Sequence, residues 1–458
     1  MSRRLDIARL AALLPSGAVV ADPDAIERYS HDESGAGPFP PSAVVFPKTA
    51  EEVSAVMRFA VATGIPVTPR GAGTGQSGGA LASLGGIVLS LERMTAVREI
   101  DAGDLVAVAE PGVILGDLQR AVLAEGLFYP PDPASLDMCT LGGNVAENAG
   151  GPRAVKYGVT RDYVLGLEVV LPTGEIVRTG RRAPKGVAGY DLTALLVGSE
   201  GTLGIVTEVT LKLLARPRRV ETALFVFGDM VAAARAVVDI TRAGLTPRTL
   251  EFIDHVAIAH VRPKVPELPI PEGAGAVLLV EMDGATDAVL DDIVRVDACA
   301  RKAGASSTVV AEGEAQRATL WRARRMVSPC LVEANRFKVA EDAAVPRSRV
   351  ADLVAAFHRI AAAHRLRACA FGHAGDGNLH LNFLFDDSSL KPEVDRAVDE
   401  LFRAVIEMRG TITGEHGVGL TKRRFLPWEQ SARIIELQKA LKRTIDPRGI
   451  LNPGKIFL

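Results

Sequence analysis

The sequence predicts an α+β fold with two domains and a C-terminal segment that returns to the first domain. The chain has 458 residues, which is too long for a single hydrophobic core. Residues 43–214 are rich in short β-like runs, whereas residues 220–410 repeat a strand–helix–strand pattern. A basic, proline-containing stretch, Ala215–Arg219, separates the two patterns. We therefore expect domains at residues 1–216 and 217–420, followed by a tail at 421–458.

Residues 43–110 are expected to alternate short strands with one clear helix, after a first helix near the N-terminus. Thr49 and Glu52 form a capping box, apolar residues follow at helical spacing, and Gly64 ends the helix. Two of the strands are joined as a hairpin by Pro172-Thr173-Gly174. The predicted strands are Ile65–Thr68, Ile87–Leu91, Leu165–Leu171, Glu175–Thr179 and Gly204–Leu214.

The second domain is expected to be an open, largely antiparallel sheet covered by helices on one side. Two strand–helix–strand units support this expectation, and a proline-rich excursion, Pro263–Gly275, separates them. The first unit has strands at Thr222–Val226 and Thr249–Asp254 around a helix at Met230–Arg242. The second has strands at Ala276–Met282 and Ser306–Val310 around a helix at Ala288–Lys302.

The composition excludes several classes of protein. A hydrophobic content of 48%, a charged content of 24% and a net charge of −2 describe a globular protein without the basic patch of a nucleic-acid binder. The four cysteines are scattered, which argues against an iron–sulfur cluster or a disulfide framework and predicts a cytoplasmic protein. No apolar run approaches the length of a transmembrane helix, and the N-terminus reads as a helix rather than a signal peptide.

A glycine-rich loop, Pro69–Ala80, follows the strand at Ile65–Thr68. Within it, Gly73–Gly78 satisfies the pattern Gly-x-Gly-x-x-Gly, but a Rossmann loop opens a helix and this one is followed by a strand. Successive backbone N–H groups can instead form an anion-binding nest beside Arg70. A flexible surface loop is the alternative, and the flanking strands disfavour it. Two further glycine-rich segments, 141–151 and 198–204, predict a large cofactor in an extended groove.

Three of the eight histidines lie in two glycine-rich stretches, residues 371–383 and 413–417. Gly375-Asp376-Gly377 has the chemistry of a turn, so the first stretch reads as a hairpin. Asn378, His380 and Asn382 then share one face of a strand, and His373 on the facing strand can reach the same side.

These residues predict a divalent metal site. Imidazole nitrogens are common metal ligands, and Glu415 would complete an open three-ligand set together with His373 and His380. His416, next to Glu415, remains able to move a proton. The alternative is that these are hydrogen-bonded strand and turn residues that bind no metal.

Over nearly its whole length, residues 40–458, the chain resembles the FAD-linked oxidoreductases of the vanillyl-alcohol-oxidase type. Within them it is similar to the D-2-hydroxy-acid dehydrogenase branch, which includes cytochrome-type D-lactate dehydrogenase, D-2-hydroxyglutarate dehydrogenase and the flavin subunit of glycolate oxidase. The resemblance rests on the motifs Pro-Arg-Gly-x-Gly-Thr-Gly, Pro-Pro-Asp-Pro, Gly-Ser-Glu-Gly-Thr-Leu-Gly, Gly-His-x-Gly-Asp-Gly-Asn-Leu-His and Gly-Glu-His-Gly-Val-Gly. It implies a two-subdomain FAD-binding domain followed by a substrate- and metal-binding cap domain.

The resemblance also implies roles for individual residues. It implies that His373, His380 and Glu415 bind the metal, that His416 is the general base, and that Arg324, Lys338 and Asn382 contact the substrate. It places FAD against Arg70, Gly71, Ala72, Gly73, Thr74, Gly75, Gln76, Ser77, Pro131, Asp132, Ser135, Thr140, Gly142, Gly143, Asn144, Ala146, Gly204, Ile205, Val206 and Asn452. Members with covalent FAD carry a histidine near the loop, and none occurs here between His31 and His255, so we expect non-covalent FAD.

The activity implied is oxidation of a D-2-hydroxy acid, such as D-lactate or D-2-hydroxyglutarate, by hydride transfer to flavin N5. The metal is expected to be zinc, with manganese and iron as alternatives. Electrons must pass to a separate acceptor, which could be a cytochrome, a quinone, an electron-transfer flavoprotein or a separate iron–sulfur subunit. Through this acceptor the cytoplasmic protein could be peripheral to the inner membrane. A homodimer is left open. The alternatives are the flavin subunit of a multi-subunit glycolate oxidase, a flavin-binding but inactive subunit of a larger complex, and a non-redox transferase that uses FAD.

Overall fold

The computed structural model describes residues 5–458 and divides them into two compact units. Unit 1 holds the chain up to residue 150 together with residues 159–216 and 415–458. Unit 2 holds residues 151–158 and 217–414. The segment 151–158 differs from the expected limits because Tyr157 donates its hydroxyl to Asp283 Oδ2 at 2.7 Å and Lys156 pairs with the same carboxylate.

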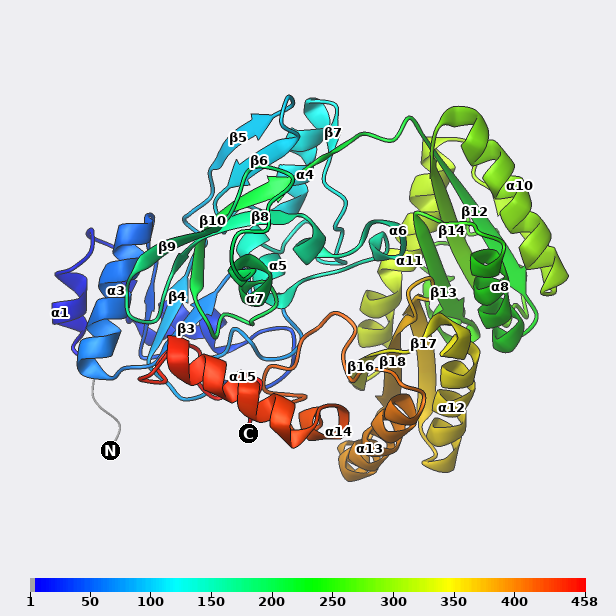
Figure 1. The fold of residues 1–458 in the computed structure, drawn as a ribbon. Helices are drawn as coiled ribbons and strands as arrows, with labels where there is room; N and C mark the ends of the chain where they lie inside the picture. The colour runs from blue at the N-terminus through cyan, green and yellow to red at the C-terminus, as the bar shows by residue number, and fades with distance from the viewer. Residues whose placement is uncertain (1–4) are drawn as a thin grey trace. The chain divides into compact units, whose positions relative to one another are not determined.

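A four-stranded sheet in unit 1 carries the glycine-rich loop at the end of one strand (Figure 1). Its order is β1 (Val19–Val20), β2 (Ala43–Val45), β4 (Ile87–Ser90), β3 (Val67–Arg70), and β4 runs parallel to both β2 and β3. The predicted helix is confirmed as α3 (Ala50–Thr63), with Thr49 as its N-cap and Gly64, at φ 70°, as its C-cap. The apolar side of α3 packs on β3 and β4 in one buried cluster.

A second sheet of unit 1 has five antiparallel strands. Its order is β5 (Val97–Asp101), β6 (Val106–Ala109), β10 (Ile205–Lys212), β8 (Val164–Val170), β9 (Ile176–Gly180). The pairing of β8 with β9 confirms the predicted hairpin. The strand predicted at Gly204–Leu214 is divided between β10 and β11 (Leu214–Ala215), and β11 pairs with β7 (Leu127–Phe128).

Several helices of unit 1 were not predicted from the sequence, and one of them lies where a loop was expected. Residues 141–151, expected as a glycine-rich loop, begin with α5 (Leu141–Glu147), which Thr140 caps by accepting from the Gly143 N–H. Glycine at 142 serves packing here, because a Cβ would press against Pro111. The other helices are α1 (Ile7–Ala11), α2 (Pro23–Ile26), α4 (Leu115–Ala124), α7 (Leu192–Leu196), α14 (Leu426–Glu429) and α15 (Ala432–Ile445).

Unit 2 is built on a seven-stranded antiparallel sheet, as the sequence predicted (Figure 1). The order is β15 (Ala305–Val310), β12 (Arg219–Phe227), β14 (Ala276–Gly284), β13 (Thr249–Asp254), β17 (Arg367–His373), β18 (Asn378–Phe385), β16 (Phe337–Ala344). The strands at the centre of this sheet are buried along most of their length, which explains their nearly continuous apolar sequences.

Helices cover both faces of this sheet, so the expectation of one covered face was wrong. One face carries α8 (Met230–Arg242), α10 (Thr286–Lys302), α12 (Val350–Ala363) and α13 (Lys391–Glu407). The other carries α9 (His255–Val261) and α11 (Glu314–Ala334), which pack against Leu224, Ile253 and Leu279. Because neighbouring strand residues point to opposite faces, apolar residues at nearly every position require cover on both sides. The short helix α6 (Ala154–Tyr157) completes the unit.

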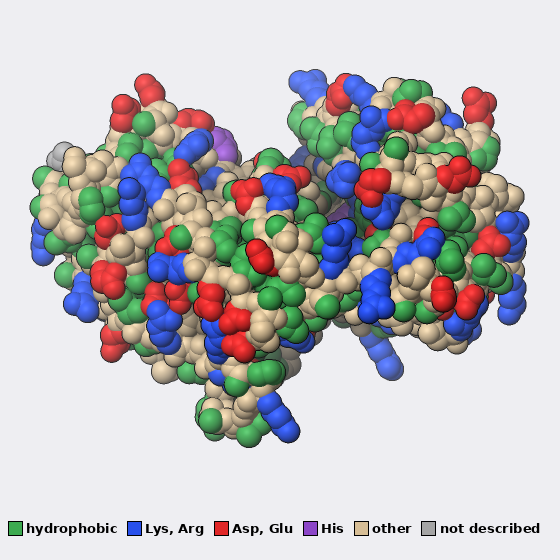
Figure 2. All heavy atoms as spheres, turned by 90° about the horizontal axis from the view of Figure 1, so that it is seen from above, with side chains coloured by type: hydrophobic (Ala, Val, Ile, Leu, Met, Phe, Trp, Pro, Cys, Tyr) green, Lys and Arg blue, Asp and Glu red, His purple; other side chains and the backbone are tan. Residues whose placement is uncertain are grey.

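The surface carries charges of both signs. On the face that Figure 2 presents, acidic and basic side chains of the described residues are intermixed without a large area of one sign. Among residues 5–458, no helix combines the length and apolar character needed to cross a bilayer.

Candidate active site

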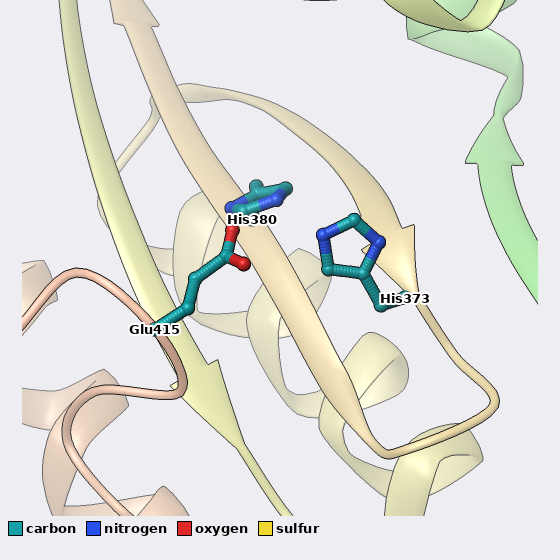
Figure 3. A group of neighbouring side chains, drawn as sticks. All are labelled: His373, His380 and Glu415. Carbon is teal, nitrogen blue, oxygen red and sulfur yellow. The ribbon is translucent and has the colours of Figure 1, made fainter. Parts of the chain in front are cut away.

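Two imidazoles and a carboxylate meet on one face of the unit 2 sheet (Figure 3). His373 ends β17, His380 lies in β18, and Glu415 follows the loop after α13. One ligand atom from each side chain lies within 4.8 Å of the others, and the two rings are 5.3 Å apart. Among the described residues this is the group whose donors suit a divalent cation, because imidazole nitrogen and carboxylate oxygen are ligands for zinc and similar metals.

The two histidines are brought together by a tight hairpin. In its register His373 pairs with Asn378 and Phe371 with His380, so both imidazoles leave the same face. Gly377 closes the turn at φ 88°, and a Cβ there would overlap the carbonyl oxygen of Val345.

Gly377→Ala should therefore destabilise unit 2 and loosen the metal group. A left-handed backbone costs an alanine about 1–2 kcal/mol, and the overlap with Val345 adds to this. Gly273→Ala is the matched control, because Gly273 has φ 77° in the same unit but no neighbour within 4 Å. We expect a larger drop in melting temperature for Gly377→Ala than for the control. Equal drops would show that the close approach to Val345 does not constrain the turn.

Glu415 is placed by its neighbours on β16. Asp342, which is fully buried, accepts hydrogen bonds from the Gly414 N–H at 2.9 Å and the Thr413 hydroxyl at 3.0 Å. The side-chain amide of Asn378 donates to the same carboxylate. These hydrogen bonds hold the backbone directly before Glu415 against β16. Asp342 is a residue whose role the sequence did not indicate.

Glu251 on β13 is a second acid that sequence analysis missed. Its fully buried carboxylate lies 2.7 Å from His373 Nδ1 and accepts from Arg324 Nε at 2.6 Å. Burial acts to raise the pKa of Glu251, but the charges and hydrogen bonds of His373 and Arg324 outweigh it and hold that pKa at about 2. An ionised carboxylate beside Nδ1 makes Nε2 the ring nitrogen suited to a metal.

The three predicted substrate contacts lie on or against the same sheet. Arg324, on α11, is buried over the ring of Phe371, with its guanidinium carbon 5.0 Å from the ring centre. Lys338, on β16, donates to Ser328 Oγ at 2.9 Å. Asn382, on β18, donates to the carbonyl oxygens of Cys369 and His380, and its buried Oδ1 has no hydrogen-bond partner.

His416 begins a loop that unit 1 holds through a buried acid. Glu200 accepts from the Val418 N–H at 2.8 Å and the Gly419 N–H at 2.7 Å. Burial raises the pKa of Glu200, and those two N–H groups oppose the change. Burial, together with the charge of Glu200, also raises the pKa of Glu147 well above its usual range. A Cβ on Gly417 would press against both carboxylates, which explains the glycine after His416.

The glycine-rich loop folds closely around Arg70. A Cβ on Gly73, at φ 80°, would overlap the Arg70 guanidinium, and a Cβ on Gly71 would overlap Thr140 Oγ1. The guanidinium is buried, with its carbon 5.5 Å from the ring centre of Tyr29. Burial lowers the pKa of Arg70, and the nearby Asp32 and Tyr29 oppose the change. No helix lies between the loop and β4, so the Rossmann interpretation fails as the sequence predicted.

Buried polar atoms without partners mark the predicted cofactor residues of unit 1. Four of the residues expected to contact FAD carry such an atom: Arg70 Nη1, Ser77 Oγ, Asn144 Nδ2 and Asn452 Oδ1. Burying an unpaired polar group costs about 1–3 kcal/mol. These donors and acceptors therefore fit a polar ligand such as a dinucleotide.

The tail holds one of these residues in place. Asn452 donates its amide N–H groups to the carbonyl oxygens of Gly79 and Glu200, at 3.0 and 2.8 Å. Its own backbone N–H donates to Val67 on β3 at 2.7 Å. The end of the chain is thereby tied to the strand that leads into the glycine-rich loop.

Two other groups of predicted cofactor residues have local structural roles. The Pro131 carbonyl accepts from Gln119 Nε2 at 2.6 Å, and the turn with Asp132 and Ser135 leads toward α5. Gly204 packs so closely on Val169 that a Cβ would overlap it, just before Ile205 and Val206 pair in β10. Packing alone therefore accounts for the glycine at 204.

Comparisons with known proteins show the family to which the chain belongs. Residues 41–180 match the family model "FAD binding domain", and residues 216–456 match "FAD linked oxidases, C-terminal domain". Glycolate oxidase subunit GlcD of Bacillus subtilis is 44% identical over 431 residues, covering 94% of this chain and 92% of the relative. D-lactate dehydrogenase of Anaerostipes hadrus is 36% identical, covering 98% and 96%.

A solved structure extends the likeness to the fold. p-Cresol methylhydroxylase with bound substrate superimposes with a TM-score of 0.82 at 19% identity, covering 98% of this chain and 96% of that one. The fold is thus the α+β, two-domain fold of p-cresol-methylhydroxylase-type flavoproteins. The chain belongs to the FAD-linked oxidases. It is an oxidoreductase, and its cofactor is FAD.

Proposed function

We propose that this protein oxidises a D-2-hydroxy acid to the 2-oxo acid with FAD and one divalent metal. The observation that carries the proposal is the meeting of His373, His380 and Glu415 within 4.8 Å. Two relatives support the substrate class, since their names refer to glycolate and to D-lactate. Residues of this chain fit both the metal and FAD. The imidazole nitrogens and the carboxylate suit the metal, and the unpaired polar atoms of unit 1 suit FAD.

When bound, FAD supplies N5 as the hydride acceptor, and a divalent metal supplies a charge that lowers the pKa of a coordinated hydroxyl group. The chain itself supplies the proton acceptor and the contacts that orient the acid. We assign the hydroxyl proton to His416. Arg324 and Lys338 are cations for the substrate carboxylate, which a guanidinium binds well through two parallel hydrogen bonds. The unpaired Oδ1 of Asn382 is a further polar contact.

Electrons then leave to a separate acceptor, which we propose to be a cytochrome, a quinone, an electron-transfer flavoprotein or an iron–sulfur subunit. The four cysteines of the chain are all free, and the metal-competent group found among residues 5–458 contains none of them. The description of one relative as a subunit supports a multi-protein pathway.

Anaerobic mixing of the yellow protein with D- and L-enantiomers of lactate and 2-hydroxyglutarate, and with glycolate, tests this proposal. We expect D-acids to bleach the flavin absorbance and L-acids to leave it. A flavin-binding subunit without activity would leave all of them unreacted, and so would a non-redox transferase. Absence of bleaching by every acid in a protein loaded with FAD and metal would therefore overturn the proposal.

A further inference from the structure

A buried chain of hydrogen bonds links Arg324, Glu251 and His373 in unit 2. Arg324 Nε donates to Glu251 Oε2 at 2.6 Å, and Glu251 Oε1 lies 2.7 Å from His373 Nδ1. The Glu251 side chain is completely buried, and the other two are less than a tenth exposed. Water therefore has little access to compete for these bonds.

The chemistry of the three groups decides which of them donates and which accepts in each hydrogen bond. A guanidinium only donates hydrogen bonds, and an ionised carboxylate only accepts them. An imidazole that binds a metal is neutral and carries one N–H, so in that state Nδ1 of His373 must carry it and donate to Glu251. Nε2 then holds a lone pair, which is the form of the ring that binds a metal.

We propose that Glu251 and Arg324 are positioning residues that fix the tautomer of His373 and thereby set the affinity for the metal. The inference rests on the metal-binding role given to His373 in the proposed function. It gives Arg324 a task that is separate from any contact with the substrate, since metal affinity is a property of the enzyme before substrate binds.

Glu251→Gln tests which groups donate and which accept in these hydrogen bonds, because the glutamine side chain has nearly the same shape as that of glutamate. Arg324 donates only, so the oxygen of the new amide must face it and the NH₂ group must face His373. Nδ1 then has to accept, the N–H moves to Nε2, and the ring loses its metal-binding lone pair. We expect Zn²⁺ affinity to fall about 10- to 100-fold, measured without substrate by competition with a chromophoric chelator.

Glu281→Gln is the matched control. Glu281 is a nearly buried acid on the neighbouring strand β14, where it accepts from Trp321 Nε1 and Thr222 Oγ1. Its ionic partner is Arg248, 3.5 Å away, rather than a histidine of the metal group. The same change of charge is thus made in the same sheet. We expect the Zn²⁺ affinity of this variant to equal that of the wild type.

A second substitution separates tautomer control from general loss of packing. A glutamine at 324 ends where Nε of Arg324 lies, because the two side chains share the same three carbons up to that point. In Glu251→Gln/Arg324→Gln, the amide oxygen at 324 can accept from the NH₂ group at 251. The oxygen at 251 is then able to face His373 again. We expect this double variant to recover most of the lost Zn²⁺ affinity, whereas a packing role predicts a further loss.

¹⁵N NMR of histidine-labelled, metal-free protein, recorded at a pH at which the imidazole is neutral, reports the tautomer directly, with the His373 signal assigned by its absence in His373→Gln. We expect Nδ1–H in the wild type, Nε2–H in Glu251→Gln and Nδ1–H again in the double variant. An unchanged tautomer and unchanged Zn²⁺ affinity in Glu251→Gln would overturn the inference. A wild-type protein that binds no Zn²⁺, Mn²⁺ or Fe²⁺ would instead overturn the metal in the proposed function, and the NMR result would still decide the role of Glu251.

Discussion

His416→Ala is expected to slow reduction of the flavin by a D-2-hydroxy acid about 10²- to 10⁴-fold, the usual contribution of a general base. The loss should appear in the single-turnover rate of anaerobic bleaching. The amount of bound FAD should not change. His416 is neither one of the residues predicted to contact FAD nor one of the residues with a buried, unpaired polar atom. Photoreduction with a chemical donor should still bleach the flavin fully. Added imidazole should restore part of the rate by replacing the missing proton acceptor.

His31→Ala is the control for this prediction. His31 lies in unit 1 like His416, but its side chain is half exposed and bonds to Glu27. This variant should react at the wild-type rate. A His416→Ala protein that is also reduced at the wild-type rate would remove His416 from the mechanism, and no rescue by imidazole would then be expected.

Local patterns explain what the sequence predicted correctly. The helix α3 has a cap at each end and an apolar stripe, all within the short stretch Thr49–Gly64. The hairpin of β17 and β18 places its histidines by alternation across one short turn. The glycine-rich loop is distinguished from a Rossmann loop by the strand, rather than helix, that comes after it. In each case the signal and the structure lie in the same short stretch of chain.

Distant pairings explain what the sequence could not predict. Glu251 contacts His373 across 122 residues, and Asp342 contacts Gly414 across 72. An acid inside the apolar strand Thr249–Asp254 was a visible anomaly, but its partner depends on the order of strands in the sheet. The second covered face of that sheet likewise depends on where α9 and α11 return.

Glycine was the most ambiguous signal. Gly73 and Gly377 are required by positive φ angles and close approaches, whereas Gly142 and Gly204 are explained by packing on Pro111 and Val169. The same residue type therefore marks a loop, a turn, a helix and the start of a strand. Only the folded structure distinguishes these uses, because a missing Cβ says nothing about which atom occupies its place.

Removal of the metal is expected to slow reduction of the flavin by an amount similar to that expected for His416→Ala. Treatment with a strong chelator should leave FAD bound but lower the rate of reduction by D-acids about 10²- to 10³-fold, corresponding to several kcal/mol of charge stabilisation. Zn²⁺, Mn²⁺ and Fe²⁺ added separately should restore the rate to different extents and so identify the working ion.

His380→Gln should lower the rate of flavin reduction as chelation does, and added metal should not restore that rate. His380 supplies one of three ligands, and the amide of a glutamine is a poorer ligand than imidazole for zinc and similar ions. His364→Gln is the comparison, because His364 lies at the end of α12 between Glu393 and Glu400, on the other side of the sheet. We expect the His380 variant to lose bound metal and substrate-driven bleaching together, while the His364 variant keeps both. Bleaching at full rate by a metal-free protein would show instead that the two histidines and Glu415 serve the fold rather than the reaction.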